Sequence, residues 1–408
     1  MTSSRAHELA ITGIGVTSAI GQEKASFSSA LFSGRSNFRV MARPLRQKDS
    51  HFLGAEIDTL ACPDRVRPNV FSAVSLSAQA ALAAVAEAWI DAKLDDVDPA
   101  RIGLVIGGSN VQQRDLVATV EKYAERMAFV RPSYALSFMD TDICGLCTEE
   151  FGIKGLALTV GGASASGQVA VSQAMQAALS GQVDVCIAVG ALMDLSYLEC
   201  QAFRSLGAMG SDRFAQNPEL ACRPYDKSRD GFIFGECCGV TVIERAEGWA
   251  RAGVTPYARI SPCAVAMDAN RRPNPSLEGE VRAIEAALQY AHLSPKDIDY
   301  INPHGSGSTA GDEVELQAIR ASGLSHAYLN ATKSLTGHGL SAAGIVEVIA
   351  TVLQMQSARL HGSVNLDEPI DPSFNWVPAA GLEQEIRCAL NISIGFGGVN
   401  TALCIQQY

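Results

Sequence analysis

The sequence predicts an α/β fold made of two packed halves. Short runs rich in β-branched and aliphatic residues alternate along the chain with longer runs of helical periodicity, the pattern of alternating strands and helices. Hydrophobic residues make up 47% of the 408 residues and charged residues only 18%, so a large core can be buried and little disorder is expected. A chain of this length holds two ordinary domains or one large fused one.

The first half contains strands and helices in alternation. Its short β-branched runs predict strands, and its longer runs of small and apolar residues predict helices. We expect strands at Leu9–Gly13, Ile102–Gly107, Leu156–Val160, Val185–Val189 and Val240–Arg245, and helices at Ser72–Ala92 and Gly167–Ser180.

The second half shows a similar number of elements. Strands are expected at Tyr257–Val265, Tyr300–Asn302, Ala327–Asn330, Leu390–Ser393 and Thr401–Gln406, and helices at Gly279–Ala291, Gly311–Ile319 and Ala342–Gln356. Charged and small residues interrupt the periodicity near Arg245–Gly253, which places the boundary there and divides the chain into residues 1–248 and 249–408. No repeat is visible in the sequence itself.

Charge and composition exclude several classes of protein. The net charge of −11 argues against nucleic acid as a partner, because phosphate binding requires a basic field. No run approaches the roughly 18 apolar residues of a membrane span, and Met1–His7 lacks the basic region and long apolar core of a signal peptide. Eleven scattered cysteines suit a reducing compartment. We therefore expect a soluble cytoplasmic protein with no membrane partner.

Two pairs of cysteines are close in sequence. Cys144 and Cys147 form a single C-x-x-C within an expected helix. Because no second pair or histidine cluster completes a metal site, we expect a structural role, with a redox or metal role as the alternative. Cys237 and Cys238 lie in an apolar strand, where adjacent side chains point to opposite faces and serve packing. No metal site is predicted.

Two familiar motifs are incomplete. Gly13 and Gly15 begin like a dinucleotide-binding loop, but Ser18 occupies the third glycine position and no acidic ribose partner follows. Ser164 lacks the G-x-S-x-G frame of a hydrolase elbow, because Ser166 stands where the last glycine belongs. Nucleotide binding and hydrolase chemistry are therefore not expected.

Four ordered segments carry a more specific signal. Their central residues are Ser164, in a small-residue turn between a strand and a helix, then His304, then His338, and then a glycine-rich loop near the C-terminus. Together with two further segments, they resemble the β-ketoacyl synthases of fatty-acid and polyketide assembly over almost the whole chain. The segments are Leu158–Gly167, Asn302–Ser308 with Gly311–Glu315, Lys333–Gly339, Gly395–Asn400, Ile11–Thr17 and Arg223–Gly231.

The resemblance implies a fold, a partner and an assembly. Members of the family have a thiolase-like, five-layered αβαβα fold built from two related halves, and they form homodimers. Their substrates are carried on the phosphopantetheine arm of an acyl carrier protein, and they use no other cofactor. No carrier or transferase segment is visible in this chain, so it resembles a free-standing synthase.

One departure from the family decides the expected reaction. The synthases place Cys, His and His in the first three segments, whereas this chain has Ser164, His304 and His338. The same Ser-His-His set occurs in synthase-like malonyl-carrier-protein decarboxylases of β-branching polyketide clusters, which this chain resembles. The turn Gly161–Ser164 and the pair Cys237-Cys238 also differ from the usual pattern of elongating synthases.

The chemistry of these residues separates decarboxylation from condensation. A cysteine thiol ionises readily at a helix N-terminus, but a serine hydroxyl is a much weaker acid and needs a paired base. Loss of CO₂ from a malonyl thioester instead requires donors for the enolate oxygen, which His304 and His338 would provide. Phe232 and Phe396 are candidates for an apolar wall that favours release of neutral CO₂. The expected product is acetyl-carrier protein.

Further residues are assigned supporting roles through the resemblance. Lys333 is expected to pair with Glu315 and hold the His338 loop, as a structural or a catalytic ion pair. The backbone N–H groups of Ser164 and Phe396 would form the family's oxyanion hole, and Gly397 and Gly398 of the same loop would contact substrate. Arg65 and Arg67 precede a predicted helix and would dock the acidic carrier protein or simply be solvated.

Three alternatives remain at this point. The chain is a condensing or acyl-transferring synthase that loads Ser164, or a non-catalytic partner subunit of an active synthase, or an elongating synthase with an engineered serine. Partner subunits of this kind usually lose the histidines, and this chain keeps both. The unusual Gly161–Ser164 turn argues against an engineered change.

Overall fold

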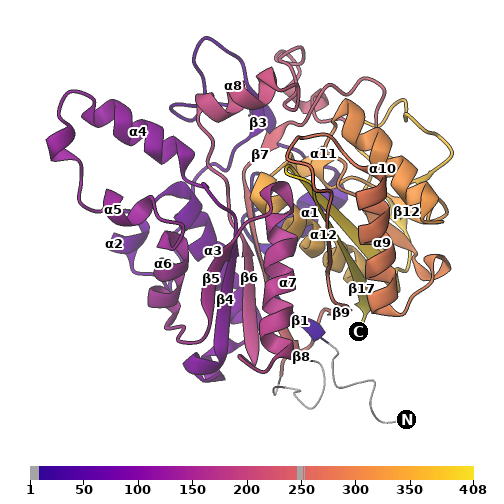
Figure 1. Ribbon diagram of the computed structural model, residues 1–408, viewed down its shortest axis with the longest axis horizontal. Helices are drawn as coiled ribbons and strands as arrows, with labels where there is room; N and C mark the ends of the chain where they lie inside the picture. The colour runs from indigo at the N-terminus through magenta and orange to yellow at the C-terminus, as the bar shows by residue number, and fades with distance from the viewer. Residues whose placement is uncertain (1–8, 246–250, 252) are drawn as a thin grey trace.

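The computed structural model describes residues 9–245, 251 and 253–408. Residues 246–250 and 252 lie inside the predicted boundary Arg245–Gly253, so the predicted division between residues 248 and 249 falls outside the described residues. Both halves of the predicted division consist of alternating strands and helices, and the α/β prediction is confirmed (Figure 1).

The first half forms one part of the main sheet, with helices on both faces. Its strands lie in the order β5, β4, β6, β8, β1; β5, β4 and β6 are parallel, and β8 is antiparallel to both of its neighbours. Helices α3 and α6 cover the outer face, and α7 covers the inner one. The bounds are β1 Leu9–Ser18, α3 Leu76–Asp91, β4 Ile102–Gly107, α6 Asp142–Phe151, β5 Ala157–Val160, α7 Ser166–Leu179, β6 Val185–Gly190 and β8 Cys237–Arg245.

The second half has the same topology. Its strands lie in the order β12, β11, β16, β17, with β9 and β10 beyond, and the parallel and antiparallel relations repeat those of the first half. Helices α9 and α10 cover the outer side, and α12 takes the place of α7. The bounds are β9 Ala258–Ile260, β10 Ala264–Met267, α9 Leu277–Ala291, β11 Tyr300–Asn302, α10 Thr309–Ala321, β12 Tyr328–Leu329, α12 Ala343–Ser357, β16 Cys388–Gly395 and β17 Val399–Gln407.

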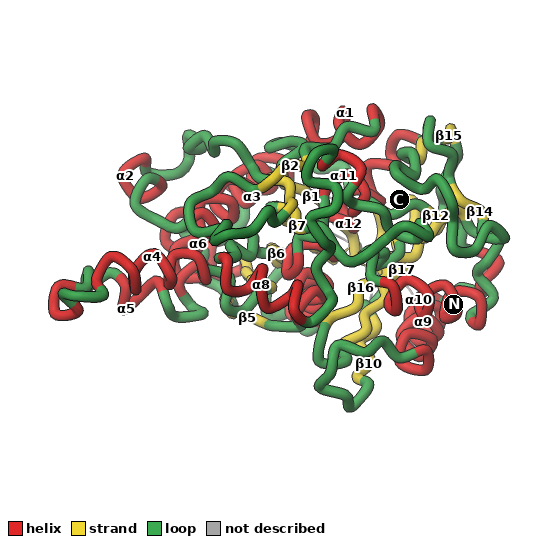
Figure 2. The backbone as a smooth tube through the Cα atoms, turned by 90° about the horizontal axis from the view of Figure 1, so that it is seen from above, coloured by secondary structure: helices red, strands yellow, loops and turns green. Residues whose placement is uncertain are grey.

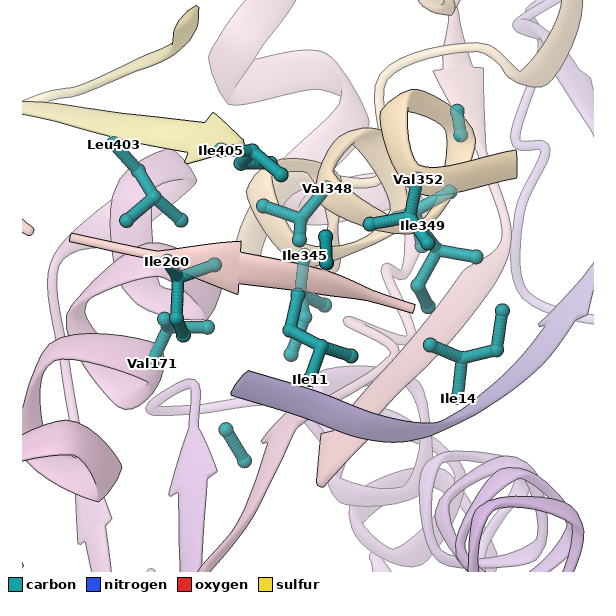
Figure 3. Close-up of a cluster of buried hydrophobic side chains, with 14 of the residues drawn as sticks. Ile11, Ile14, Val171, Ile260, Ile345, Val348, Ile349, Val352, Leu403 and Ile405 are labelled. Atoms are coloured by element: carbon teal, nitrogen blue, oxygen red, sulfur yellow. The ribbon is translucent and has the colours of Figure 1, made fainter. Parts of the chain in front are cut away.

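The two halves meet at α7 and α12, which lie between the two parts of the sheet and contact both. This arrangement gives the five αβαβα layers, and the prediction of two related halves is confirmed. The largest buried cluster fills this centre; Figure 3 shows side chains that meet there from β1, α7, β9, α12 and β17, among them Ile11, Val171, Ile260, Ile345 and Leu403. Each such side chain contributes about 1.5–3 kcal/mol by burial, so the centre holds the halves together.

Most of the smaller elements lie outside the main sheet and the helices that cover it. A three-stranded sheet of β2, β3 and β7 lies beside the main one, and β13 pairs with β15. Helices α4 and α5 extend outward as a projection at one end of the molecule (Figure 2). The bounds are α1 Lys24–Ser33, β2 Phe38–Val40, β3 Leu53–Ala55, α2 Pro68–Phe71, α4 Gln113–Tyr123, α5 Tyr134–Ser137, α8 Tyr197–Ser205, β7 Phe234–Gly235, α11 Lys333–Thr336, β13 Arg359–Leu360, β14 Asn375–Trp376 and β15 Leu382–Glu383.

Two predicted strands differ from the observed ones for identifiable reasons. The strand expected at Leu9–Gly13 continues to Ser18 through two glycines. A Cβ on Gly15 would lie 2.0 Å from the Ala84 carbonyl oxygen, so this glycine lets α3 pack directly on β1 rather than ending the strand. The strand expected at Tyr257–Val265 is two strands, because Pro262 between β9 and β10 has no N–H for the ladder.

The predicted placement of the two cysteine pairs agrees with the structure. Cys144 and Cys147 are both buried on α6, and burial raises the pKa of both thiols. Cys237 packs in the central cluster and Cys238 in the cluster under α3, on opposite faces of β8 as expected. Among the described residues, no group of three or more His, Cys, Asp or Glu is arranged to hold a metal ion.

The sequence analysis expected no run long and apolar enough to span a membrane, and by length and composition alone this expectation is wrong. Residues Leu340–Ser357, which include α12, form a helical stretch long and apolar enough to cross a membrane. However, 89% of this stretch is buried inside the protein, because α12 is a central helix packed against both parts of the sheet. Its apolar character therefore follows from its place in the core.

Candidate active site

The three predicted catalytic residues line one cavity of about 290 Å³. Ser164 comes from the turn before α7, His304 from the loop after β11, and His338 from the loop after α11. The sequence separates Ser164 from His338 by more than 170 residues, and the packing of α7 against α12 brings them to one place. We call this space the Ser164 cavity.

Ser164 lies in a tight turn between β5 and α7. The turn Ala163–Ala165 leads directly into α7, and Ala163 has a positive φ of 48°, which is uncommon for a residue with a side chain. Ser164 is half-buried, and within the described chain no group hydrogen-bonds its hydroxyl. Ser164 therefore has no general base aligned with it.

His304 is held through its backbone. Glu315 on α10 accepts hydrogen bonds from the N–H groups of His304 (2.6 Å) and Gly305 (2.9 Å), and from the Tyr225 hydroxyl (2.5 Å). The ammonium of Lys333 lies 3.4 Å from the Nδ1 atom of the His304 ring. Because an ammonium can only donate, Nδ1 accepts and the ring proton is on Nε2.

His338 carries its ring proton on the same atom. The backbone N–H of Leu340 donates to His338 Nδ1 at 3.2 Å, which leaves Nε2 as the N–H donor. The His338 backbone is bound to the side sheet, because its N–H donates to the Ile233 carbonyl at 2.7 Å. The two imidazole rings lie edge to face with their centroids 5.2 Å apart.

Burial keeps both histidines neutral. Burial lowers the pKa of His304 and of His338 well below 6.5, and the charge of Lys333 lowers both further. At neutral pH each ring is therefore an imidazole with one N–H rather than an imidazolium. Two such donors in one cavity can bind one developing oxyanion without giving up a proton.

The predicted ion pair between Lys333 and Glu315 is wrong. Lys333 forms its ion pair with Glu347 on α12, and its ammonium also donates to the His304 carbonyl oxygen. Glu315 is already occupied by backbone N–H groups and a tyrosine, so it supports His304 instead. Burial raises the pKa of Glu347 to about 7, which the charge of Lys333 opposes.

Aromatic side chains form an apolar side of the cavity. Phe232 lies edge-on to His338 with centroids 5.2 Å apart, and Phe203 contacts both Phe232 and Phe396. All three phenylalanines line the Ser164 cavity. The predicted positions of Phe232 and Phe396 therefore agree with an apolar wall, and Phe203 adds to it.

The glycine-rich loop brings Phe396 close to Ser164. A Cβ on Gly395 would lie 2.2 Å from the Gly162 carbonyl oxygen, so only glycine permits this approach of the two loops. Among the described residues, none accepts a hydrogen bond from the backbone N–H of Ser164 or Phe396, which leaves both available to an oxyanion. Gly398 lines the cavity, whereas Gly397, with a φ of 90°, serves the turn and is not part of the lining.

Arg65 and Arg67 do not line the cavity. Arg65 is bound to Asp95, and Arg67 is bound to Glu149 (2.5 Å) and to Glu150. Both arginines remain partly exposed beside α2. A carrier protein that docks there has to compete with these acidic partners.

Comparison with family models identifies the family. The family model described as Beta-ketoacyl synthase, N-terminal domain, matches residues 6–248, and the model of the C-terminal domain matches residues 257–367. The chain belongs to the β-ketoacyl synthase family. In this chain Ser164 lies in the turn before α7, and both histidines line the same cavity as Ser164.

Relatives in the family cover the whole chain. The polyketide biosynthesis malonyl-ACP decarboxylase PksF of Bacillus subtilis (strain 168) is 59% identical over 100% of this chain and 98% of its own. The putative polyketide beta-ketoacyl synthase 1 of Streptomyces halstedii is 32% identical, with 97% of each chain covered. The crystal structure of a beta-ketoacyl synthase from Burkholderia phymatum STM815 superposes with a TM-score of 0.89 at 25% identity, covering 98% of this chain and 100% of that one.

Three buried residues near the site were missed by the sequence analysis. Tyr225 and Glu347 complete the support of His304 and Lys333, and Glu280 on α9 lines the cavity. A lone acidic residue inside the apolar helix 342–356 was a signal for Glu347, because a buried charge needs a partner. Glu280 gave no such signal, because its helix also carries exposed acidic residues.

Proposed function

We propose that this member of the β-ketoacyl synthase family is a malonyl-ACP decarboxylase of polyketide biosynthesis, which converts malonyl-ACP to acetyl-ACP. The observation that carries the proposal is the pair of neutral histidines, both with Nε2–H donors, in a cavity whose nucleophile position holds a serine without a base. The relative in Bacillus subtilis whose printed name is malonyl-ACP decarboxylase is 59% identical to this chain over its full length.

The geometry accounts for the bond changes. The malonyl thioester oxygen binds between the Nε2–H groups of His304 and His338, and the malonyl carboxylate lies toward the phenylalanine wall. When the bond to the carboxylate breaks, CO₂ leaves and the electron pair forms an enolate, whose oxygen the two donors stabilise. The enolate carbon then takes one proton, which gives the acetyl thioester.

Condensation requires an acyl group on residue 164, and this site is poorly suited to load one. A serine hydroxyl needs a base that accepts its proton. On each ring the acceptor atom Nδ1 is already occupied, by Lys333 on His304 and by the Leu340 N–H on His338. Neither histidine therefore has a lone pair free for the Ser164 hydroxyl. The enolate meets no acyl group and is protonated instead.

Intact mass spectrometry of the carrier protein tests the proposal. Incubation of malonyl-ACP with the enzyme is expected to lower the mass of the loaded carrier by that of CO₂, which gives acetyl-ACP. The mass of the enzyme should stay unchanged. A stoichiometric acyl ester on Ser164 that turns over would establish the condensing or acyl-transferring alternative. An unchanged malonyl-ACP together with an unmodified enzyme would favour the non-catalytic partner subunit.

Residues near α2 are the candidates for carrier docking. We propose that Arg65 and Arg67 exchange their present acidic partners for acidic side chains of the carrier protein. The substitution of both by alanine should then raise the KM for malonyl-ACP and leave the KM for malonyl-pantetheine unchanged. Equal KM values for malonyl-ACP in both forms would remove these residues from the docking surface.

We also propose that the protein is a homodimer. Strand β5 is the last strand of the main sheet, and its four residues are exposed or half-exposed, so its outer edge is available for pairing. The α4–α5 projection exposes several large apolar side chains, which is typical of an interface. Its exposed residues are Leu116, Val120, Met127, Phe129, Leu136, Phe138 and Met139.

Analytical ultracentrifugation measures the assembly directly. We expect a species of twice the 43.1 kDa chain mass, and the Phe138→Asp substitution should shift it toward the monomer. The matched substitution Ile90→Asp alters another exposed apolar residue, on α3 and outside the projection, and should leave the dimer intact. A wild-type protein that sediments as a monomer would contradict the proposal.

We also propose a cytoplasmic location. The scattered free cysteines and the carrier-bound substrate agree with it.

A further inference from the structure

A buried acid without a hydrogen-bond partner lies on the wall of the Ser164 cavity. Glu280, in the first turns of α9, is 0% exposed, and it is one of the residues that line the cavity. Within the described chain neither of its carboxyl oxygens has a hydrogen-bond partner, although both are buried. A buried carboxylate in this state would be costly, since buried charges are normally paired.

The surroundings of Glu280 favour its protonated form. The elements packed on α9 are β10, β17 and α10, and the titratable groups that act on Glu280 from them are Glu315 on α10 and Asp268 just after β10. Both are acidic, and no cation is among the groups acting on it. Burial, together with these two like charges, raises the pKa of Glu280 to about 9.

The decarboxylation needs a proton, and the other acids of the cavity are not placed to supply one. Asp312 accepts N–H groups from Tyr225 and Gly307 on its two oxygens, and both oxygens of Glu315 are occupied by N–H and O–H donors. The half-exposed Asp268 accepts a hydrogen bond from Asn400 at 2.8 Å. His304 and His338 use their single N–H groups to bind the enolate oxygen.

We propose that Glu280 is the general acid that protonates the enolate carbon. The bond between the methylene and carboxylate carbons breaks, CO₂ leaves, and the electron pair forms the enolate. The enolate carbon takes the proton of the Glu280 carboxyl group, which gives acetyl-ACP and the Glu280 carboxylate. A water molecule then returns a proton to Glu280, and its hydroxide combines with CO₂ to give bicarbonate. This inference rests on the proposed decarboxylation.

The test compares Glu280→Gln with Glu278→Gln in single-turnover formation of acetyl-ACP. Glutamine keeps the shape of the side chain but has no acidic proton, and we expect the rate to fall by about 10²-fold or more. Glu278 lies on the same helix, and its side chain is 84% exposed. Its substitution controls for a loss of charge on α9 and should leave the rate unchanged.

The pH profile separates a catalytic acid from a structural residue. The wild-type rate should fall above pH 9, because Glu280 loses its proton there, and Glu278→Gln should show the same fall. Glu280→Gln should lack this fall.

The dependence of stability on pH tests the protonation of Glu280 independently. In the unfolded protein the Glu280 carboxyl releases its proton above about pH 4.5, whereas in the folded protein it keeps the proton up to about pH 9. The free energy of unfolding of the wild type should therefore decline between these two pH values. Glu280→Gln should show a smaller decline that ends at lower pH, because Glu347, with a pKa raised to about 7, contributes in both proteins.

Two results would overturn the assignment. One is a folded Glu280→Gln protein whose rate lies within threefold of the wild type. The other, which needs no variant, is a wild-type rate that does not fall above pH 9. In both cases a wild-type enzyme that still converts malonyl-ACP to acetyl-ACP leaves the proposed function standing, whereas a wild-type enzyme that produces no acetyl-ACP removes that function itself.

Discussion

Replacement of His304 or His338 by alanine is expected to lower the decarboxylation rate by about 10²-fold or more, which corresponds to roughly 3–4 kcal/mol of transition-state stabilisation. Each ring carries its proton on Nε2, because Nδ1 accepts from Lys333 in one case and from the Leu340 N–H in the other. Each alanine therefore removes one donor to the enolate oxygen. The measurement is the kcat for acetyl-ACP formation.

Ser164→Ala serves as the comparison within the cavity, and it should cost far less than either histidine variant. Ser164 has no base aligned with it in the described chain, so the loss of its hydroxyl removes no step of the decarboxylation. His326→Ala, at an exposed position, controls for the loss of an imidazole elsewhere. A collapse of activity in Ser164→Ala, with nearly normal histidine variants, would reverse the assignment of roles.

Replacement of Lys333 by methionine is expected to lower the free energy of unfolding by about 3–5 kcal/mol, because it leaves Glu347 as a buried and unpaired acid. The variant also loses the hydrogen bond to the His304 carbonyl oxygen and the contact that sets the His304 tautomer. Activity should therefore fall as well. Urea denaturation and the decarboxylation assay measure the two effects separately.

Two further variants make this prediction specific. In Lys333→Met/Glu347→Leu the unpaired charge is gone, and apolar replacement of a buried ion pair is often neutral. Stability should then recover while activity stays low. Lys227→Met breaks an exposed ion pair, in which the side chains of Lys227 and Glu368 are 61% and 73% exposed. It should lower the free energy of unfolding by about 1 kcal/mol or less. A stable Lys333→Met protein would show that the buried pair contributes little.

Much of the site could be predicted because it is encoded in local segments. Ser164, His304, His338 and Phe396 each lie in a short motif, and the order of these motifs is specific enough to place all four around one cavity. The serine also points to the reaction, since the acidity of a hydroxyl is a property of the side chain itself. The strands and helices of the core were predicted for the same reason, because periodicity is a local property.

Only the tertiary structure decided which groups meet. The partner of Lys333 is Glu347 rather than Glu315, because α12 lies against the Lys333 segment while Glu315 is occupied by the backbone of the His304 loop. The raised pKa of Glu280 follows from burial between α9 and its neighbours, which no pattern within α9 reveals. The relation between the halves is likewise visible only as a repeated strand order. The sequence by itself determined the reactive groups and the elements that carry them, whereas pairing, burial and protonation depend on residues brought together from distant parts of the chain.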